Sequence, residues 1–274
     1  MVAMALGDLM VVLTGVILNR VVGIYAPVSL LSYTPACRVQ TVLVYISRDF
    51  SVWSTVAFTF DRLVAICCPK LRVSYCTERL ATVIVCVVLG LSCLQYVPLY
   101  LALEPFYFAN GIPMYCTTIS NFYVDPEWIA YSWMNHIFTP CLALCLILLF
   151  NAVTVRHILI SSRVRRALRG TDNNTDPELE NRRKSVVLLF SISGSVVLLW
   201  ATYTVHHLYY RITNTYVYSG GDDPIFILQE AGHMLLLLSC CSNTCIYVAT
   251  QRKFREELKN GLKYPLTLVV ATLK

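Results

Sequence analysis

Phe60-Asp61-Arg62-Leu63 places an acid and a base near the end of a long apolar segment, just before Val64-Ala65-Ile66-Cys67-Cys68-Pro69. Charged side chains are costly inside a bilayer, so a pair at this depth indicates function. Cys37 lies 25 residues before Arg62 in the same segment, and at 1.5 Å per helical residue the separation is about 37 Å. That length predicts one tilted membrane crossing, with Cys37 at one face and Asp61-Arg62 at the other.

The composition is that of a membrane protein. Hydrophobic residues make up 57% of the 274 and charged residues 14%, with a mean hydropathy of +0.60. Six runs are long enough to cross an apolar core of about 30 Å, near residues 1–22, 35–67, 80–103, 129–160, 185–210 and 226–250. The sequence therefore predicts an all-α transmembrane bundle over residues 1–250.

Basic residues set the orientation, because Lys and Arg near helix ends are retained on the cytoplasmic side. Sixteen of the 22 basic residues follow the second, fourth and sixth runs, whereas the opposite loops carry acids such as Glu104, Asp125 and Asp222. Both ends of the bundle should then be cytoplasmic. The net charge of +6 reflects this topology, so we expect no nucleic-acid partner.

Residues 251–263, after the last run, space Phe254, Leu258 and Leu262 four apart among basic residues. This pattern predicts an amphipathic helix on the inner leaflet, where the basic residues meet anionic lipid. Residues 264–274 are expected to form a tail.

The outer side holds a turn signal and two cysteines. Most of the 12 cysteines fall in predicted helices, where thiols pack as small apolar groups, and only Cys37 and Cys116 lie on the oxidising outer side. Between them, Asn110-Gly111 separates two short apolar segments, which predicts a β-hairpin. We expect this hairpin over the mouth of a pocket.

Several motifs resemble those of the rhodopsin-like (class A) G-protein-coupled receptors. Phe60-Asp61-Arg62 with Cys37 upstream resembles the family's third helix, and Met4-Ala5-Leu6-Gly7-Asp8 its second. Ser242-Asn243-Thr244-Cys245-Ile246-Tyr247 is similar to the family's N-P-x-x-Y, with Thr at the proline. The resemblance implies a seven-helix bundle represented by helices two to seven, with the first helix missing and residues 251–263 as helix eight.

Within that family, the chain looks closest to the orphan group called probable G-protein coupled receptor 139 and its sister 142. The shared segments are 47–53, 60–62, 182–185 and 241–247. This resemblance implies aromatic amino acids or related peptides as agonists, and coupling mostly to Gq-type heterotrimeric G proteins.

The family resemblance also implies roles for individual residues. It pairs Cys37 with Cys116 in a disulfide. Coupling and switch roles fall to Asp61, Arg62, Trp200, Asn243 and Tyr247. A sodium ion would be held by Asp8, Ser51, Ser239 and Asn243, whose oxygens suit a hard cation. A hydrogen-bonded polar core without an ion is the open alternative.

Other positions depart from the family pattern. Thr202 stands at the proline of helix six, Leu148 at the tyrosine of helix five, and Arg182 where many members carry the acid that locks Arg62. Losing a proline restores a backbone donor and weakens a helix kink. A receptor-like remnant that no longer signals is therefore the alternative function.

The ligand hypothesis depends on Arg48-Asp49 in the middle of the third helix. Arg48 lies 14 residues before Arg62, about 21 Å further out, and neighbouring helical residues point about 100° apart. We expect Arg48 to face a pocket, and Asp49 to face helices four and five, near His136 or Asn135. A buried unpaired Arg favours an anionic ligand group such as a carboxylate. An internal ion pair of Arg48 with Asp49 or Glu230 is equally open.

The expected ligand-binding residues are Tyr45, Arg48, Trp200, Tyr203, His207 and His233. This lining suits a small aromatic or peptide ligand. We therefore expect a multi-pass plasma-membrane receptor that transduces an extracellular ligand to heterotrimeric G proteins. A transporter would need internal repeats and an enzyme a nucleophile with its base; the sequence has neither, so the transporter is the less favoured hypothesis and no enzyme is expected.

Overall fold

A computed structural model of the chain describes residues 2–168, 177–213, 222–250 and 255–256. Within these residues, six helical segments are long and apolar enough to cross a membrane. The first crossing joins α1 (Val2–Val11), the π-helix η1 (Val12–Val21) and α2 (Val22–Tyr25). The others are α3 (Thr34–Cys67), α5 (Glu78–Leu101), the joined α6 (Pro126–His136), η4 (Ile137–Leu142) and α7 (Ala143–Leu168), then α8 (Pro177–Thr213) and α9 (Pro224–Thr250).

These bounds differ from the predicted ones mainly at the ends of the helices. α3 begins one residue before the expected 35, and α5 begins and ends two residues before the expected 80 and 103. α8 begins eight residues before the expected 185, because the polar turns at its start continue the helix that the apolar run only partly covers. The amphipathic helix at 251–263 and the tail lie outside the described residues, apart from Arg255 and Glu256.

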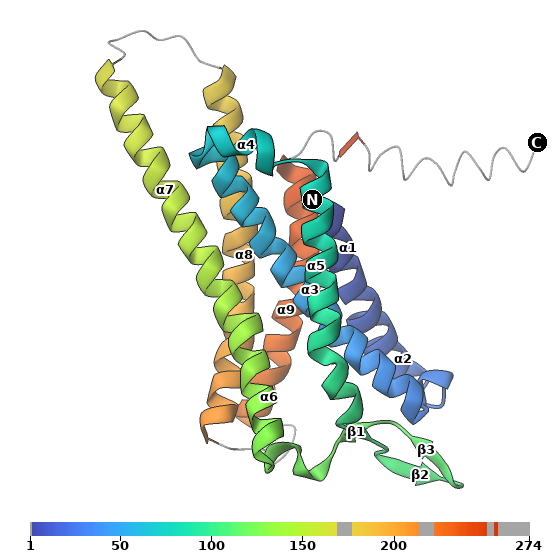
Figure 1. Cartoon of the computed structure of the whole chain (residues 1–274). Coiled ribbons are helices and arrows are strands. Elements are labelled where there is room, and N and C mark those ends of the chain that lie inside the picture. The colour runs from blue at the N-terminus through green and yellow to red at the C-terminus, as the bar shows by residue number, and fades with distance from the viewer. Residues whose placement is uncertain (1, 169–176, 214–221, 251–254, 257–274) are drawn as a thin grey trace, which may run out of the picture.

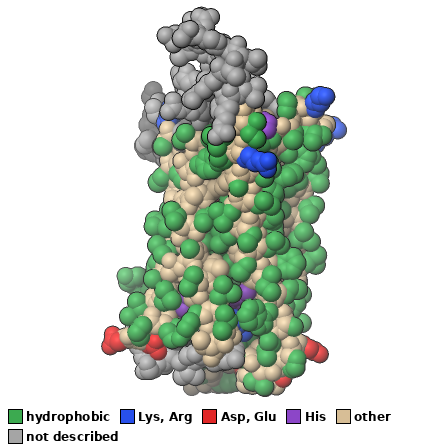
Figure 2. Space-filling view, turned by 90° about the vertical axis from the view of Figure 1, so that its left-hand side faces the viewer, with side chains coloured by type: hydrophobic (Ala, Val, Ile, Leu, Met, Phe, Trp, Pro, Cys, Tyr) green, Lys and Arg blue, Asp and Glu red, His purple; other side chains and the backbone are tan. Residues whose placement is uncertain are grey.

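The bundle has two chemically different ends. Figure 1 shows the short α4 (Pro69–Tyr75) at the same end as the start of the chain, and the strands at the opposite end. On the face seen in Figure 2, described Lys and Arg side chains gather at one end and Asp and Glu at the other, with hydrophobic side chains between them. This is the polarity expected of helices crossing a bilayer with the basic end inside.

The outer segment forms the predicted hairpin. β2 (Tyr107–Ala109) pairs antiparallel with β3 (Ile112–Met114). Asn110 and Gly111 have φ of 51° and 78°, the left-handed pair that a type I′ turn requires. β1 (Leu103–Glu104) pairs with β4 (Thr117–Thr118), and the Cys37–Cys116 disulfide ties this segment to α3 with a Cα–Cα distance of 5.8 Å.

The expected position of the hairpin was wrong. Figure 1 shows β2 and β3 projecting sideways from the bundle, and Phe106 and Phe108 are exposed. The outer cavity is instead lined by Thr118 of β4 and by the 3₁₀-helix η3 (Ser120–Tyr123). Tyr115 explains the difference, because its N–H donates to the Ser32 carbonyl and its hydroxyl to the Pro27 carbonyl, holding the hairpin over the end of the first crossing.

The core lies along α3 and α8. One buried cluster combines Val52 and Val56 of α3 with Ile147, Trp200 and Leu236 from three other helices. α8 and α9 pack tightly at a glycine: a Cβ built on Gly232 would lie 3.0 Å from the Tyr203 Cα. Because that neighbour is backbone, the helices would have to separate to admit even a methyl group.

We expect Gly232→Ala to lower the free energy of unfolding by about 1–3 kcal/mol, the usual cost of overpacking. Thermal unfolding of the purified protein would measure it. Gly194→Ala, also in a helix but with nothing within 4 Å of the added Cβ, is the matched control and should be neutral or slightly stabilising. Equal effects of the two substitutions would contradict a tight α8–α9 contact.

Candidate functional site

An outer cavity of about 240 Å³ lies between the helices. All six residues expected to bind a ligand line it: Tyr45, Arg48, Trp200, Tyr203, His207 and His233. It also takes in Arg211, Gln229 and Tyr123, which the sequence did not single out, and Asn135, which was expected only as a partner of Asp49. α3, η3, α6, α8 and α9 all contribute to this wall.

Arg48 enters the cavity without an acidic partner. Its guanidinium carbon lies 5.7 Å from the centre of the Tyr45 ring, and its buried Nε has no hydrogen-bond partner in the described part of the chain. No carboxylate described in the structure lies within 4.0 Å of Arg48. Glu230 instead pairs with Arg20 at 2.8 Å, so the internal ion pair of Arg48 with Glu230 is not formed.

Arg211 is a second cation in the cavity wall, and the sequence did not indicate it. It is 7% exposed, its Nη2 donates to the Ser132 hydroxyl, and its guanidinium carbon lies 5.4 Å from the Tyr123 ring centre. Nε and Nη1 are buried without partners in the described residues. Its spacing of four from His207, itself four after Tyr203, could have indicated this face.

Aromatic rings and histidines fill the wall between these cations. The Tyr203 ring centre lies 6.0 Å from that of Trp200, 4.2 Å from that of His207 and 5.5 Å from that of His233. His136 Nε2 and His207 Nδ1 are 2.9 Å apart and share a hydrogen bond. Among the described residues, no three His, Cys, Asp or Glu side chains gather as a metal site would require.

Asp49 faces the family's fourth and fifth helices, here α5 and η4, as expected. The side chains expected to satisfy it, His136 or Asn135, were wrong. The Tyr96 hydroxyl donates to Oδ1 at 3.0 Å and the Thr139 hydroxyl to Oδ2 at 2.9 Å. His136 is engaged elsewhere, by the Ser132 carbonyl and by His207. Both Asp49 oxygens are thus satisfied at 1% exposure, and no ion pair with Arg48 forms within 4.0 Å.

A second cavity of about 410 Å³ adjoins the first towards η1. The two cavities share Tyr45, Arg48 and His233. Asn19 and Arg20 supply polar groups on its far side. Arg48 therefore lies on the boundary between the two cavities, and its side chain borders both of them.

Deeper in the bundle, Asp8 joins three helices. The Ser51 hydroxyl donates to Oδ1 at 2.7 Å and Asn243 Nδ2 to Oδ2 at 3.1 Å. Ser239 stands one step away, accepting from Trp200 Nε1 at 3.2 Å and donating to the Leu236 carbonyl. Buried Asn243 Oδ1 has no hydrogen-bond partner in the described residues, so the oxygens around Asp8 fit a small hard cation.

At the inner end, Asp61 and Arg62 pair with each other. Arg62 donates from Nε at 3.1 Å and from Nη2 at 2.9 Å, both to Asp61 Oδ2. Tyr75 of α4 lies beside them, and its pKa is raised by burial and further by the Asp61 carboxylate. Of the other expected switch residues, Trp200 and Asn243 are buried, while the side chains of Tyr247 and Arg182 lie outside the described part of the structure.

The departures from the family pattern also have a structural counterpart. α8 and α9 run without interruption past Thr202 and Thr244, as expected where proline is replaced. Leu148 is 53% exposed, whereas neighbouring Ile147 is fully buried. Leu148 therefore lies on the outer face of α7.

Comparison with known protein families places these features in a family context. A family model described as 7 transmembrane receptor (rhodopsin family) matches residues 1–247. This span includes all six membrane-crossing helices, the outer cavity and the Asp61–Arg62 pair.

We expect Tyr96→Phe to lower the free energy of unfolding by about 1–3 kcal/mol, because a buried carboxylate loses one of its two donors. Thermal unfolding would measure this, with Tyr25→Phe, at an 83% exposed position, as the control. In a double-mutant cycle, the effect should shrink when Asp49 is already Asn. An undiminished effect would mean that Tyr96 acts through packing alone.

Proposed function

The chain belongs to the rhodopsin family of seven-transmembrane receptors, so it is a multi-pass plasma-membrane receptor and not an enzyme. From this premise we propose the chemical class of its ligand and the path by which ligand binding reaches a G protein. Family membership implies an extracellular ligand and a G-protein partner in general. The ligand that we propose is a small aromatic molecule that carries a carboxylate group, bound in the outer cavity. Its binding is relayed to a heterotrimeric G protein at Arg62.

The observation that carries this proposal is the pair of guanidinium groups in the outer cavity. Arg48 and Arg211 both have buried nitrogens without partners in the described residues. A buried cation without a counter-charge is costly, and a planar guanidinium matches a carboxylate through paired hydrogen bonds. A ligand carboxylate would supply what neither Asp49 nor Glu230 supplies.

Size and lining favour an aromatic amino acid over a long peptide. A cavity of about 240 Å³ is smaller than the usual range for drug-sized ligands, roughly 300–1,000 Å³. The rings of Tyr45, Trp200 and Tyr203 offer stacking and edge contacts. The adjoining second cavity gives room for the extension of a short peptide. Aromatic amino acids and related peptides are also what the resemblance to receptor group 139 implies.

For the inner end we propose that Arg62 leaves Asp61 on activation and caps the C-terminus of the Gα subunit. Its fork of donors suits the carbonyl groups at a helix end. Trp200, Asn243 and Tyr247 are the proposed relay, which begins at the ligand because Trp200 lines its cavity. Coupling of the Gq type is proposed only from the resemblance to group 139.

A non-signalling receptor-like protein is the second candidate. The uninterrupted α8 and α9 favour it, since helices without a proline kink have lost one means of bending. This candidate and the first predict the same ligand chemistry but opposite responses in a signalling assay.

We further propose that the first described crossing corresponds to the family's second helix. Asp8 supports this numbering, because it meets Ser51 and Asn243 in the way the resemblance implies. The same residues, with Ser239, would hold a sodium ion and stabilise the resting bundle. The ion would contribute a positive charge among the oxygens of three helices.

Cells expressing this chain should raise calcium in response to tryptophan or phenylalanine but not to tryptamine, which lacks the carboxylate. Arg48→Gln should raise the concentration for half-maximal response at least tenfold, because a charge-assisted contact is lost. Arg38→Gln, at an arginine on α3 outside both outer cavities, is the matched control. An Arg48→Gln receptor with unchanged potency would refute the carboxylate contact.

Arg62→Ala should abolish the response while leaving ligand binding intact, which separates coupling from recognition. Parallel cAMP measurements would distinguish Gq-type coupling from other types. Ligand binding without any response, at confirmed surface expression, would favour the non-signalling candidate.

Sodium should raise the unfolding temperature of the purified protein relative to choline at equal ionic strength, because an ion bound only to the folded state stabilises it. Asp8→Asn should remove this difference by removing the charged ligand. Glu127→Gln, at an exposed outer position, should retain it. Stabilisation that persists in Asp8→Asn would place the ion elsewhere or nowhere.

A further inference from the structure

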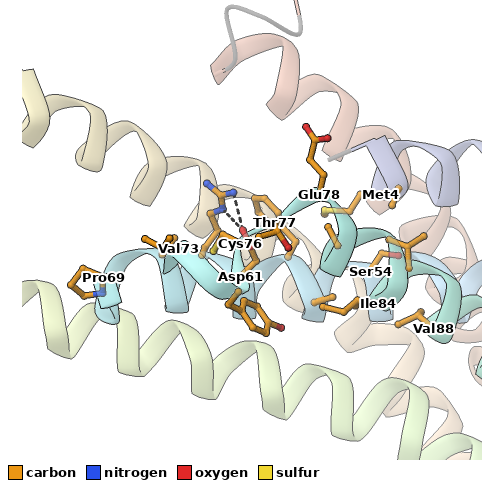
Figure 3. Close-up of a pocket in the computed structure, with 18 residues that line it drawn as sticks. Met4, Ser54, Asp61, Pro69, Val73, Cys76, Thr77, Glu78, Ile84 and Val88 are labelled. Carbon is orange, nitrogen blue, oxygen red and sulfur yellow. Dashed lines mark hydrogen bonds and ion pairs between the residues drawn. The ribbon is translucent and has the colours of Figure 1, made fainter. Parts of the chain in front are cut away.

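A cavity of about 780 Å³ lies at the inner end of the bundle, between α1, α3, α4 and α5 (Figure 3). None of its lining residues belongs to either outer cavity. On α5 the lining runs from Glu78 to Val88, a helical rise of about 15 Å. Because Glu78 begins a membrane-crossing helix, the cavity extends from the inner boundary of the membrane into its apolar part.

The deep part of this cavity is apolar except for one hydroxyl. Met4, Ile84, Val85 and Val88 supply apolar wall. Ser54 lines the same region, and Figure 3 draws it between the helices beside Ile84. Ser54 is 6% exposed, and its buried Oγ has no hydrogen-bond partner in the described residues. A hydroxyl left unpaired at this depth calls for a polar atom on whatever fills the cavity.

The rim at the membrane boundary carries two acids and one base, namely Asp61, Glu78 and Arg62. Arg62 uses only Oδ2 of Asp61, so Oδ1 takes no part in that pair. Glu78 is exposed and forms no ion pair with any side chain that the structure describes. The rim therefore matches a head group that carries a cation together with an anion.

We propose that this cavity binds an aminophospholipid of the inner leaflet. The ammonium group donates to Glu78 and to the free oxygen of Asp61, and the phosphate accepts from Arg62. Ser54 lies seven residues outward of Asp61, about 10 Å along α3, where it donates to an ester carbonyl. The acyl chains continue along the apolar wall of α5.

A primary ammonium is the chemistry that distinguishes this occupant from other lipids. It offers three donors to the carboxylates, whereas a choline head offers none. A sterol has no charge to place between two acids and a base. Because the lipid would share the Asp61 carboxylate with Arg62, its binding would weaken the Asp61–Arg62 ion pair. An effect of this weakening on G-protein coupling rests on the role proposed for Arg62 above. The lipid site itself does not depend on that role.

The test is competition between lipids for the purified full chain in nanodiscs of phosphatidylcholine containing one tenth phosphatidylethanolamine. Lipid retained by the protein after transfer to detergent would be measured by native mass spectrometry. We expect at least fivefold enrichment of the ethanolamine lipid over its share of the nanodisc. Glu78→Gln should bring the enrichment close to one.

Glu127→Gln is the matched control, because Glu127 is an exposed acid in the first turn of α6 just as Glu78 is in the first turn of α5. It should keep the enrichment. Val88→Phe, which fills the deep cavity from α5, should reduce retention of the lipid several-fold, and Ser54→Ala should lower it without filling the space. Ser54→Ala also serves if the Phe variant fails to fold.

Equal retention of ethanolamine and choline lipids would overturn the proposal, as would enrichment that survives Glu78→Gln. Preference for phosphatidylglycerol over phosphatidylethanolamine would also overturn it, since the basic inner surface would then select anionic heads without using the two acids. A lipid site confirmed in a protein that gives neither a calcium nor a cAMP response would leave this inference standing and the proposed signalling function refuted.

Discussion

A carboxylate buried between membrane helices must accept hydrogen bonds from other helices, and the arrangement of this bundle depends on that constraint. Asp8 takes its donors from Ser51 on α3 and Asn243 on α9. Asp49 takes its donors from Tyr96 on α5 and Thr139 in η4. Since a carboxylate at membrane depth is costly without donors, helices that moved apart would leave an acid unsatisfied. α3 takes part in both networks and is the element against which the others are positioned.

The cations follow the opposite pattern. Arg48 and Arg211 are embedded among aromatic rings, yet they keep nitrogens without partners. The acids that could have neutralised Arg48 are engaged, Asp49 by hydroxyl groups and Glu230 by Arg20. In the outer cavity the acids are thus satisfied internally while Arg48 and Arg211 keep unpartnered nitrogens among the described residues, and the proposed ligand carboxylate rests on this imbalance. The inner end shows the reverse arrangement, because there the cation Arg62 is paired while Asp61 keeps one oxygen outside the ion pair.

Some features of this fold follow from local sequence, and others depend on geometry between helices. The length of α3 follows from one apolar run, and the hairpin from Asn110-Gly111, because each depends on neighbouring residues alone. The partners of Asp49 could not be predicted, since the choice among Tyr96, Thr139 and His136 depends on how α5 and η4 are rotated. The hairpin was expected over the pocket because its distant contact with the first crossing, made through Tyr115, leaves no trace in local sequence. Arg211 was missed because its burial depends on Ser132 and Tyr123, which lie far from it in the chain.

The hydroxyl contacts to Asp49 have a mechanical consequence for α3. Arg48 and Arg62 are 14 residues apart on this helix, so they point within about 40° of each other when viewed down its axis. Rotation of α3 about its axis would move Arg48 and Arg62 in the same direction. The hydrogen bonds from Tyr96 and Thr139 to Asp49 oppose this rotation. We infer that these contacts make α3 resist rotation about its own axis, so that a displacement starting in the outer cavity would pass more easily through a neighbouring helix. α8 is suited to that part, since it presents Arg211 and Trp200 to the same cavity three turns apart.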